Sequence, residues 1–453
     1  MNRSMSRCAA VLGALLVAGH ACAVEGDLDP AFGAGGIVVD ANARPEWPAL
    51  AVQPDGKLVT CDTASLPGGG DDFYVTRYNA NGTLDTSFGA DGITRIGFTD
   101  GDYTFGDSCT ALAVQPDGRI VLVGVASGSS FPIGGSAAFA VARVDANGLL
   151  DASFGGGTGR EWFDIAGYLY SFASAVAIQP DGRIVVAGAA QTEDHDEDFA
   201  IVRLLSDGSF DDSFGVAGQV THGFADLRSW DVANAVAIDA SGRIVVAGAA
   251  AFDGALLRLS SDGSPDPLFG DGGVVMAGIG DYPASSGTVR SMILDHAGRI
   301  VVAGFYGFTD GASVNHADMT AVRFLADGSR DPEFGTGGMA TVAFDLATGG
   351  TGADQAEALV EQPDGKLFLA GQAEYGGDGN LLAAVARIDE HGLLDPAFGD
   401  GGKRVIGFGD GSSTQWLTGA VMQGSRLVVI GGAAPGEVIL RFQDEHILAN
   451  GFD

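Results

Sequence analysis

A segment of about sixty residues recurs along this chain and constrains its fold more than any other feature. Its clearest copy opens with AVAIQPDGRIVVAG at residues 175–188 and closes with DFAIVRLLSDGSFDDSFG at residues 198–215. A basic residue after the first turn marks the register of seven copies: Lys57, Arg119, Arg183, Arg243, Arg299, Lys366 and Arg426. Fixed-period repeats of this kind indicate an array of identical structural units.

Each copy predicts four short strands and no helix. In the copy at 175–215, the first strand covers 175–179, and a Pro-Asp-Gly turn joins it to an apolar β-branched strand at 184–188. An alternating strand follows at 199–204, and a fourth strand follows the Phe-Gly pair. Seven four-stranded units predict an all-β fold, a seven-bladed β-propeller, with an open solenoid as the alternative.

The two ends of the repeat array favour the closed ring. The last copy lacks its fourth strand, whereas an unassigned strand at 36–40 precedes the first complete copy. In a ring, the N-terminal strand would complete the last blade and remove an exposed sheet edge. We therefore predict one propeller over residues 24–453, closed by the strand at 36–40.

One arginine and one aspartate recur in each copy. Arg203 shares a strand face with apolar residues, so it should be partly buried and need an acidic partner. The arginines are Arg77, Arg143, Arg203, Arg258, Arg323, Arg387 and Arg441. The aspartates are Asp85, Asp151, Asp211, Asp266, Asp331, Asp395 and, for the last copy, Asp29 near the N-terminus. We interpret these as structural ion pairs rather than a basic binding site, because a ligand does not need one residue in every blade.

The pattern AxAxQPDGKIVVAG…ARxxxDGxLDxxFGxxG resembles the bacterial delta-60 repeat over residues 26 to about 445. Three copies depart from it at the Pro-Asp-Gly turn: 240–242, 296–298 and 423–425. The resemblance implies a secreted or surface propeller-like protein. It implies no particular activity.

Composition and charge limit the partners. The formal net charge is −34, so a nucleic-acid partner is not expected, because phosphate binding needs clustered Lys and Arg. The acidic surface suits cations or basic partners, or simply solubility. We predict a monomer.

The N-terminus reads as a secretory signal peptide over residues 1–23. Arg3 and Arg7 precede a short apolar run, and a small-x-small site ends at Ala23. The residues before Cys22 match a lipid-anchor box poorly, so we predict a secreted or periplasmic protein. After cleavage Cys61 and Cys109 remain, and an oxidising compartment favours a disulfide between them.

The loops that differ between copies are the places where a ligand would bind. They contain most of the tyrosines and tryptophans, whose flat rings suit sugars and peptides. The candidates are Tyr103, Tyr168, Tyr170, Trp230, Tyr282, Tyr306, Tyr375 and Trp416, with Trp47 in a loop of the same kind. The alternative is that these rings form small local cores under the loops.

The same loops are acidic. Asp194, Asp196 and Asp198 have the spacing that begins a calcium loop, but the glycine and the final glutamate of such a loop are missing. Calcium is therefore a weak expectation, and no other cofactor is predicted. Asp107, Asp231 and Asp354 each precede a first strand by the same interval, where they could ring the channel mouth or cap a backbone turn.

Motifs of common enzyme classes are absent: the sequence contains no HExxH, no GxSxG and no phosphate-binding loop. We therefore predict a secreted, non-enzymatic propeller that binds a carbohydrate or a surface protein through its variable loops. The first alternative is a hydrolase or lyase that acts on an extracellular polymer at the channel mouth. The second is a calcium-dependent surface or adhesion protein.

Overall fold

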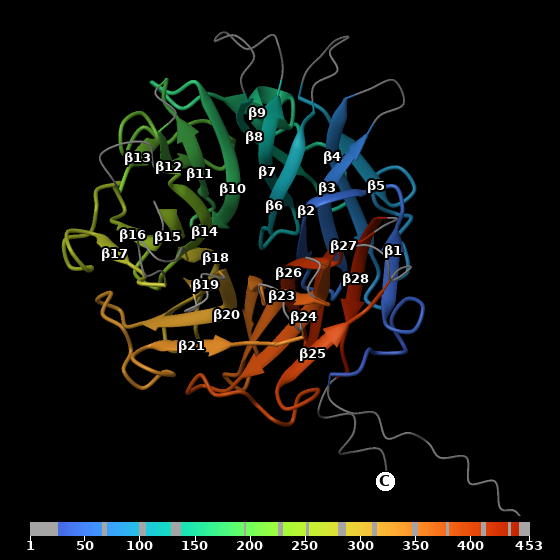
Figure 1. The fold of residues 1–453 in the computed structure, drawn as a ribbon. Helices are drawn as coiled ribbons and strands as arrows, with labels where there is room; N and C mark the ends of the chain where they lie inside the picture. The colour runs from blue at the N-terminus through green and yellow to red at the C-terminus, as the bar shows by residue number, and fades with distance from the viewer. Residues whose placement is uncertain are drawn as a thin grey trace, which may run out of the picture.

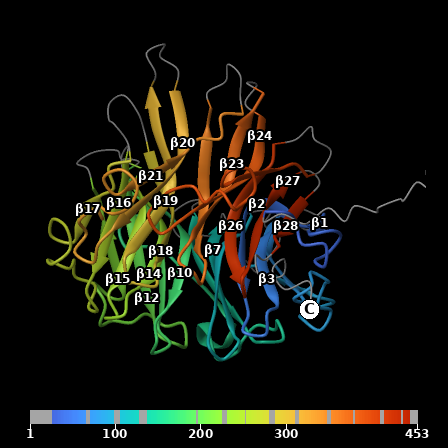
Figure 2. The ribbon, with the colours of Figure 1, turned by 90° about the horizontal axis from the view of Figure 1, so that it is seen from below.

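The structure is a ring of seven four-stranded antiparallel sheets (Figure 1), shown from a second direction in Figure 2. The computed structural model describes residues 26–65, 70–98, 106–127, 137–193, 196–224, 230–250, 253–279, 287–309, 315–346, 352–376, 380–408, 414–433 and 436–443. In that part of the chain the only helical segment is a short 3-10 turn, η1 (Gly155–Gly157). The predicted seven-bladed β-propeller is confirmed.

Blades 1 to 6 place their strands from the channel outwards in chain order, and blade 7 does so except that β1 is its outermost strand. Blades 1 to 3 are β2 (Arg44–Val52), β3 (Leu58–Ser65), β4 (Asp71–Tyr78), β5 (Ile93–Ile96); β6 (Ser108–Val114), β7 (Ile120–Ser127), β8 (Ala137–Val144), β9 (Arg160–Phe163); and β10 (Tyr170–Ile178), β11 (Ile184–Gln191), β12 (Glu197–Leu204), β13 (Gln219–His222). Blades 4 and 5 are β14 (Val232–Ile238), β15 (Ile244–Ala250), β16 (Asp253–Leu259), β17 (Val274–Met276); and β18 (Gly287–Leu294), β19 (Ile300–Thr309), β20 (Asn315–Phe324), β21 (Met339–Val342). Blades 6 and 7 are β22 (Asp354–Glu361), β23 (Leu367–Tyr375), β24 (Asn380–Ile388), β25 (Lys403–Ile406); and β26 (Trp416–Gln423), β27 (Arg426–Ala433), β28 (Gly436–Arg441), completed by β1 (Ile37–Asp40).

The N-terminal strand closes the ring, as the sequence predicts. β1 pairs antiparallel with β28, with Val39 opposite Val438 (Figure 1). The backbone N–H of Asp29 also donates to the carbonyl of Arg441 at 2.8 Å. The seventh blade therefore joins both ends of the array, and β1 covers the edge that β28 would otherwise expose.

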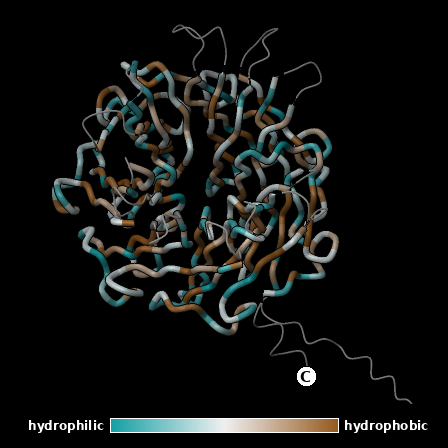
Figure 3. The backbone as a smooth tube through the Cα atoms, viewed as in Figure 1, coloured by the Kyte–Doolittle hydropathy of each residue, from teal (hydrophilic) through white to brown (hydrophobic). Residues whose placement is uncertain are grey.

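The core lies between blades rather than in one central mass. The second strand of each blade is buried on both faces: Val186 of β11 packs toward blade 2, and Val185 packs toward blade 4. Hydrophobic residues are accordingly distributed around the whole ring (Figure 3). This explains why these strands are continuous apolar runs rather than alternating ones.

The Asp-Gly pair after the third strand is required by close packing between blades. Gly208 has a φ of +91° and lies against the ring of Phe154 in the preceding blade. A side chain there would be strained by the backbone and would also meet that ring.

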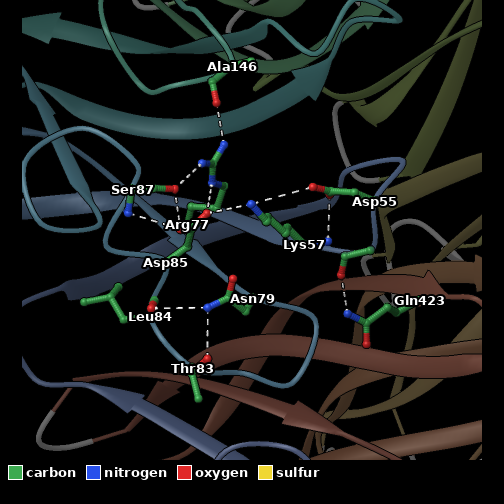
Figure 4. A network of polar contacts seen from close by, with 11 residues as sticks. Asp55, Lys57, Arg77, Asn79, Thr83, Leu84, Asp85, Ser87, Ala146 and Gln423 are labelled. Atoms are coloured by element: carbon green, nitrogen blue, oxygen red, sulfur yellow. Dashed lines mark hydrogen bonds and ion pairs between the residues drawn. The ribbon is translucent and has the colours of Figure 1, made fainter.

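The repeated arginine joins neighbouring blades. In blade 1, Arg77 Nε lies 2.7 Å from Asp85 Oδ2, and its Nη1 donates to the carbonyl of Ala146 in blade 2 (Figure 4). The guanidinium also lies over the ring of Phe88, with 4.6 Å to the centroid. Lys57 adds a second cation to the same carboxylate.

The same arrangement recurs around the ring. The other ion pairs are Arg143–Asp151, Arg203–Asp211, Arg258–Asp266, Arg323–Asp331, Arg387–Asp395 and Arg441–Asp29, at 2.8 to 2.9 Å. Each arginine is at most 5% exposed. These residues are part of the scaffold, and none of them lines the cavity described below.

A disulfide joins Cys61 of β3 to Cys109 of β6, with 5.9 Å between the Cα atoms. It links blade 1 to blade 2 across a separation of 48 residues. Crosslinks of this kind typically stabilise a fold by about 2–4 kcal/mol.

Residues 1–25 lie outside the described residues, so the predicted signal peptide and its cleavage after Ala23 remain expectations. Among the described residues, no helix is long and apolar enough to cross a membrane.

Candidate functional site

A cavity of about 740 Å³ occupies the centre of the ring. Residues of all seven innermost strands line it, so it is the propeller channel itself. Its volume falls within the range of about 300–1,000 Å³ that is typical of ligand pockets.

A β-bulge in each innermost strand turns one side chain into this cavity. In six blades the pairing with the second strand skips a single residue, for example between Ala173 and Ala175 of β10. The skipped residues all line the cavity: Thr110, Ser174, Asn234, Arg290, Glu357 and Thr418. Bulges commonly redirect a side chain in this way near functional sites. Here they produce a ring of polar groups inside the channel.

Several members of this ring bind the neighbouring blade. Thr110 Oγ1 donates to the carbonyl of Ala173 at 2.7 Å, and Thr418 Oγ1 donates to that of Pro48 at 2.7 Å. Asn234 Nδ2 donates to the carbonyl of Val289 at 2.7 Å. These three side chains therefore hold the innermost strands together.

The other notable members of the ring are the charged pair Arg290 and Glu357. Arg290 Nε lies 3.5 Å from Glu357 Oε2, across the seam between blades 5 and 6. Burial raises the pKa of Glu357, and the neighbouring Arg290 opposes that increase. A cation and a carboxyl of raised pKa thus lie side by side in the channel, where either could contact a ligand.

Large aromatic rings lie at the end of the channel where the innermost strands begin. Trp47, Phe172 and Trp230 all line the cavity; Phe172 and Trp230 precede the bulge of their blade, and Trp47 lies within that of blade 1. Trp47 is 54% exposed and Trp230 is 73% exposed. Glu197 lines the same end, and burial raises the pKa of its carboxyl.

Those aromatic candidates from the sequence that the structure describes do not form one cluster. Trp230 lines the cavity, and Tyr170 contacts the cavity residue Phe172 edge-on, with 5.8 Å between the ring centroids. Tyr168 packs against the core between blades 2 and 3, and its hydroxyl donates to Asp198. Tyr168 thus fits the alternative of a local core under the loops.

The remaining candidates lie elsewhere. Trp416 packs against Gly432 of β27, Tyr306 lies opposite Asp318, and Tyr375 is exposed at the end of β23. Tyr103 and Tyr282 lie outside the described residues.

Asp107, Asp231 and Asp354 accept backbone hydrogen bonds and do not line the cavity. Their carboxylates accept the N–H groups of Phe98, Phe224 and Phe344, respectively. Gln415 does the same for Phe408 in blade 7, so the position does not require a charge. Burial raises the pKa of Asp107 to about 6 and that of Asp354 to about 7.

The calcium candidates are only partly described. Asp194 lies outside the described residues, and Asp198 accepts the hydroxyl of Tyr168. Within the described ranges, no group of three or more His, Cys, Asp or Glu side chains is arranged to hold a metal ion.

Arg290, Glu357, Glu197 and Phe172 were missed by sequence reasoning. The sequence carries a signal for two of them, because Arg290 and Glu357 hold the position where four other copies have Thr, Ser or Asn and the first has Pro48. A charged residue at a position that is uncharged in the five other copies marks a departure from the scaffold.

The fold and the repeated blades define a propeller-repeat protein. Five segments match the family model described as "Domain of unknown function (DUF5122) beta-propeller": residues 53–88, 115–154, 179–214, 240–269 and 362–398. This match supports a propeller-repeat family for the chain. The delta-60 name itself remains a prediction.

No curated protein matches the chain. Among solved structures, it is similar to a polysaccharide lyase of family PL25, an ulvan lyase, with 12% identity, coverage of 95% of this chain and 99% of that chain, and a TM-score of 0.51. An α-L-arabinofuranosidase from Fusarium graminearum has 9% identity, coverage of 90% and 95%, and a TM-score of 0.44. A protein of unknown function from Dyadobacter fermentans has 10% identity, coverage of 78% and 98%, and a TM-score of 0.43. At these identities the likeness concerns the fold alone.

Proposed function

We propose that the protein is a secreted, monomeric, non-enzymatic propeller that binds a neutral carbohydrate chain at the mouth of its channel. The cavity supports this: two exposed tryptophans, Trp47 and Trp230, lie above a ring of polar side chains. Sugar rings present apolar faces to aromatic rings and hydroxyls to polar groups. The ulvan lyase of similar fold is named for a polysaccharide substrate, but a shared fold does not transfer a substrate.

Charge favours a neutral saccharide over an acidic one. The chain has a formal net charge of −34, which repels anionic polymers. Two of the three charged residues that line the cavity are glutamates, and the third, Arg290, is already paired with Glu357.

Replacing either Trp47 or Trp230 by alanine is expected to weaken glycan binding. Loss of an aromatic contact of about 1.4–2.8 kcal/mol corresponds to roughly a 10- to 100-fold rise in Kd. A glycan array on the mature chain would identify the ligand, and calorimetry would compare the variants. Trp162→Ala is the matched control, because Trp162 lies on the outermost strand β9 and does not line the cavity.

Two results would contradict this proposal. One is a mature protein that binds no neutral glycan on the array. The other is an affinity that changes no more in Trp47→Ala and Trp230→Ala than in Trp162→Ala.

A second candidate is a hydrolase or lyase that acts on an extracellular polysaccharide. The observation that favours it is Glu357, a carboxyl whose pKa is raised by burial and which lies next to Arg290 in the channel. A carboxyl of raised pKa is suited to general acid–base catalysis.

For the enzyme candidate, Glu357→Gln should lower turnover by about 10²–10⁴-fold, the usual contribution of a general acid or base. Product release from each polysaccharide bound on the array would be measured for the wild type and this variant. Absence of turnover by the wild type on every glycan that it binds would exclude the enzyme candidate and leave the binding proposal intact.

A further inference from the structure

Blade 1 differs from the six other blades at one buried position. In the other blades, the second strand has a glycine at the equivalent position: Gly124, Gly188, Gly248, Gly304, Gly371 and Gly431. A Cβ atom at any of these glycines would lie well under 3.0 Å from a backbone carbonyl oxygen of the innermost strand. Blade 1 has Asp62 at this position, and Asp62 is fully buried.

The innermost strand of blade 1 follows a different path where it faces Asp62. In the other blades the pairing skips one residue, whereas in blade 1 it jumps from Ala49 opposite Cys61 to Arg44 opposite Thr63. Residues 45–48 therefore have no paired residue in β3, and Asp62 has none in β2. The side chain fills the space that glycine leaves open elsewhere, so β2 must bulge away from it.

The wide bulge changes the position of one side chain in particular. Trp47 stands immediately before the channel-lining position of its strand, which is held by Pro48. The equivalent residues of the other blades are Cys109, Ala173, Ala233, Val289, Ala356 and Leu417, and each is at most 1% exposed. Trp47 is 54% exposed and lines the channel. The bulge has thus moved a normally buried position into the cavity.

Local contacts hold the bulge in place. Asp62 Oδ1 accepts the backbone N–H of Thr63 at 2.8 Å, and the same carboxyl accepts the backbone N–H of Glu46 in the bulge. Pro45 and Pro48 have no N–H to offer to a strand partner, so the bulged segment loses little by leaving the sheet.

We propose that Asp62 is a positioning residue: by replacing the glycine of the other blades, it forces the bulge at 45–48 and places Trp47 in the channel as a surface for stacking a sugar ring. The ligand part of this inference rests on the proposed carbohydrate site. The positioning part does not, and it can be tested without any ligand.

The test uses Trp47 fluorescence in a background that carries Trp162→Phe, Trp230→Phe and Trp416→Phe. Asp62→Gly restores the residue of the six other blades, so Trp47 should withdraw into the blade. We expect a blue-shifted emission and at least about a twofold loss of acrylamide quenching, because a buried ring does not meet the solvent. Asp62→Ala keeps the Cβ atom and Asp62→Asn keeps the side-chain shape, so both should retain the quenching of the parent protein.

Unchanged quenching in Asp62→Gly would overturn the proposal. Loss of quenching in Asp62→Ala would also overturn it, because the position of Trp47 would then depend on the carboxyl and not on the Cβ atom. If Asp62→Gly does not fold, the pair Asp62→Ala and Asp62→Asn still decides, because a withdrawn Trp47 in both contradicts the steric argument.

Glycan binding in the otherwise wild-type protein separates the two proposals. If Trp47 withdraws in Asp62→Gly and the affinity falls as far as in Trp47→Ala, both hold. If Trp47 withdraws but the affinity is unchanged, the positioning role holds and the role of Trp47 in ligand binding is rejected.

Discussion

Replacing Asp29 by alanine is expected to lower the free energy of unfolding by about 3–5 kcal/mol, the usual cost of leaving a buried charge without its partner. Asp29 Oδ2 lies 2.9 Å from Arg441 Nη2, and both residues are at most 6% exposed. In the variant, the guanidinium of Arg441 would keep only the carbonyl of Ala80 and the side chain of Gln423 as polar partners. Urea unfolding would measure the loss.

The part of the fold that the substitution destabilises distinguishes this ion pair from the six others. Asp29 and Arg441 are separated by 412 residues, so their contact helps to close the ring. Asp211→Ala is the matched control, because Arg203 and Asp211 form the same ion pair within one continuous blade. We expect both variants to lose stability, but only Asp29→Ala should show faster hydrogen exchange in β1 and β28. Equal protection of β1 in the two variants would refute a special role in closure.

The fold could be predicted from the sequence because its determinants are local and repeated. Most copies contain the Pro-Asp-Gly turn, the apolar second strand and the Phe-Gly pair. A chance resemblance in one copy therefore does not change the predicted fold. Closure could be predicted for a related reason. The seventh arginine, Arg441, has Ala449 where the other copies have the repeated aspartate, and Asp29 stands in the unassigned N-terminal segment.

The candidate site was less predictable because it depends on where side chains point. Trp230 and Tyr168 both belong to variable loops, but Trp230 reaches the channel and Tyr168 packs into a core between blades. Arg290 and Glu357 lie within strands and carry no motif. Their exposure to the channel results from a β-bulge, and the sequence contains no direct signal for it apart from the glycine on the neighbouring strand.

Stability should also depend on pH through Asp62. Burial raises the pKa of this carboxyl to about 8, and the nearby carboxylates of Glu46 and Asp40 add to the increase. In the unfolded chain the pKa of an aspartate is about 3.9. The folded state therefore holds a proton that the unfolded chain releases, and the stabilisation is complete below pH 4 and lost as the pH rises to about 8.

Comparison with Asp62→Asn isolates this effect, because asparagine resembles the protonated carboxyl and does not titrate. Each pH unit between the two pKa values costs about 1.4 kcal/mol, so the wild type should lose roughly 3–4 kcal/mol relative to the variant between pH 5 and pH 8. Urea unfolding at each pH would measure the difference. Glu437, Tyr74 and Tyr78 are other titratable groups of this seam, and they are present in both proteins, so their contributions largely cancel.

The pH profile is informative because the two roles of Asp62 differ in what they require. The bulge at 45–48 requires only a side chain at this position, whereas the pH dependence requires a carboxyl. A difference in unfolding free energy that stays constant from pH 5 to pH 8 would show that Asp62 is ionised in the folded protein. That result would reject a protonated Asp62 but not the steric role of its side chain, and Trp47 should still occupy the channel.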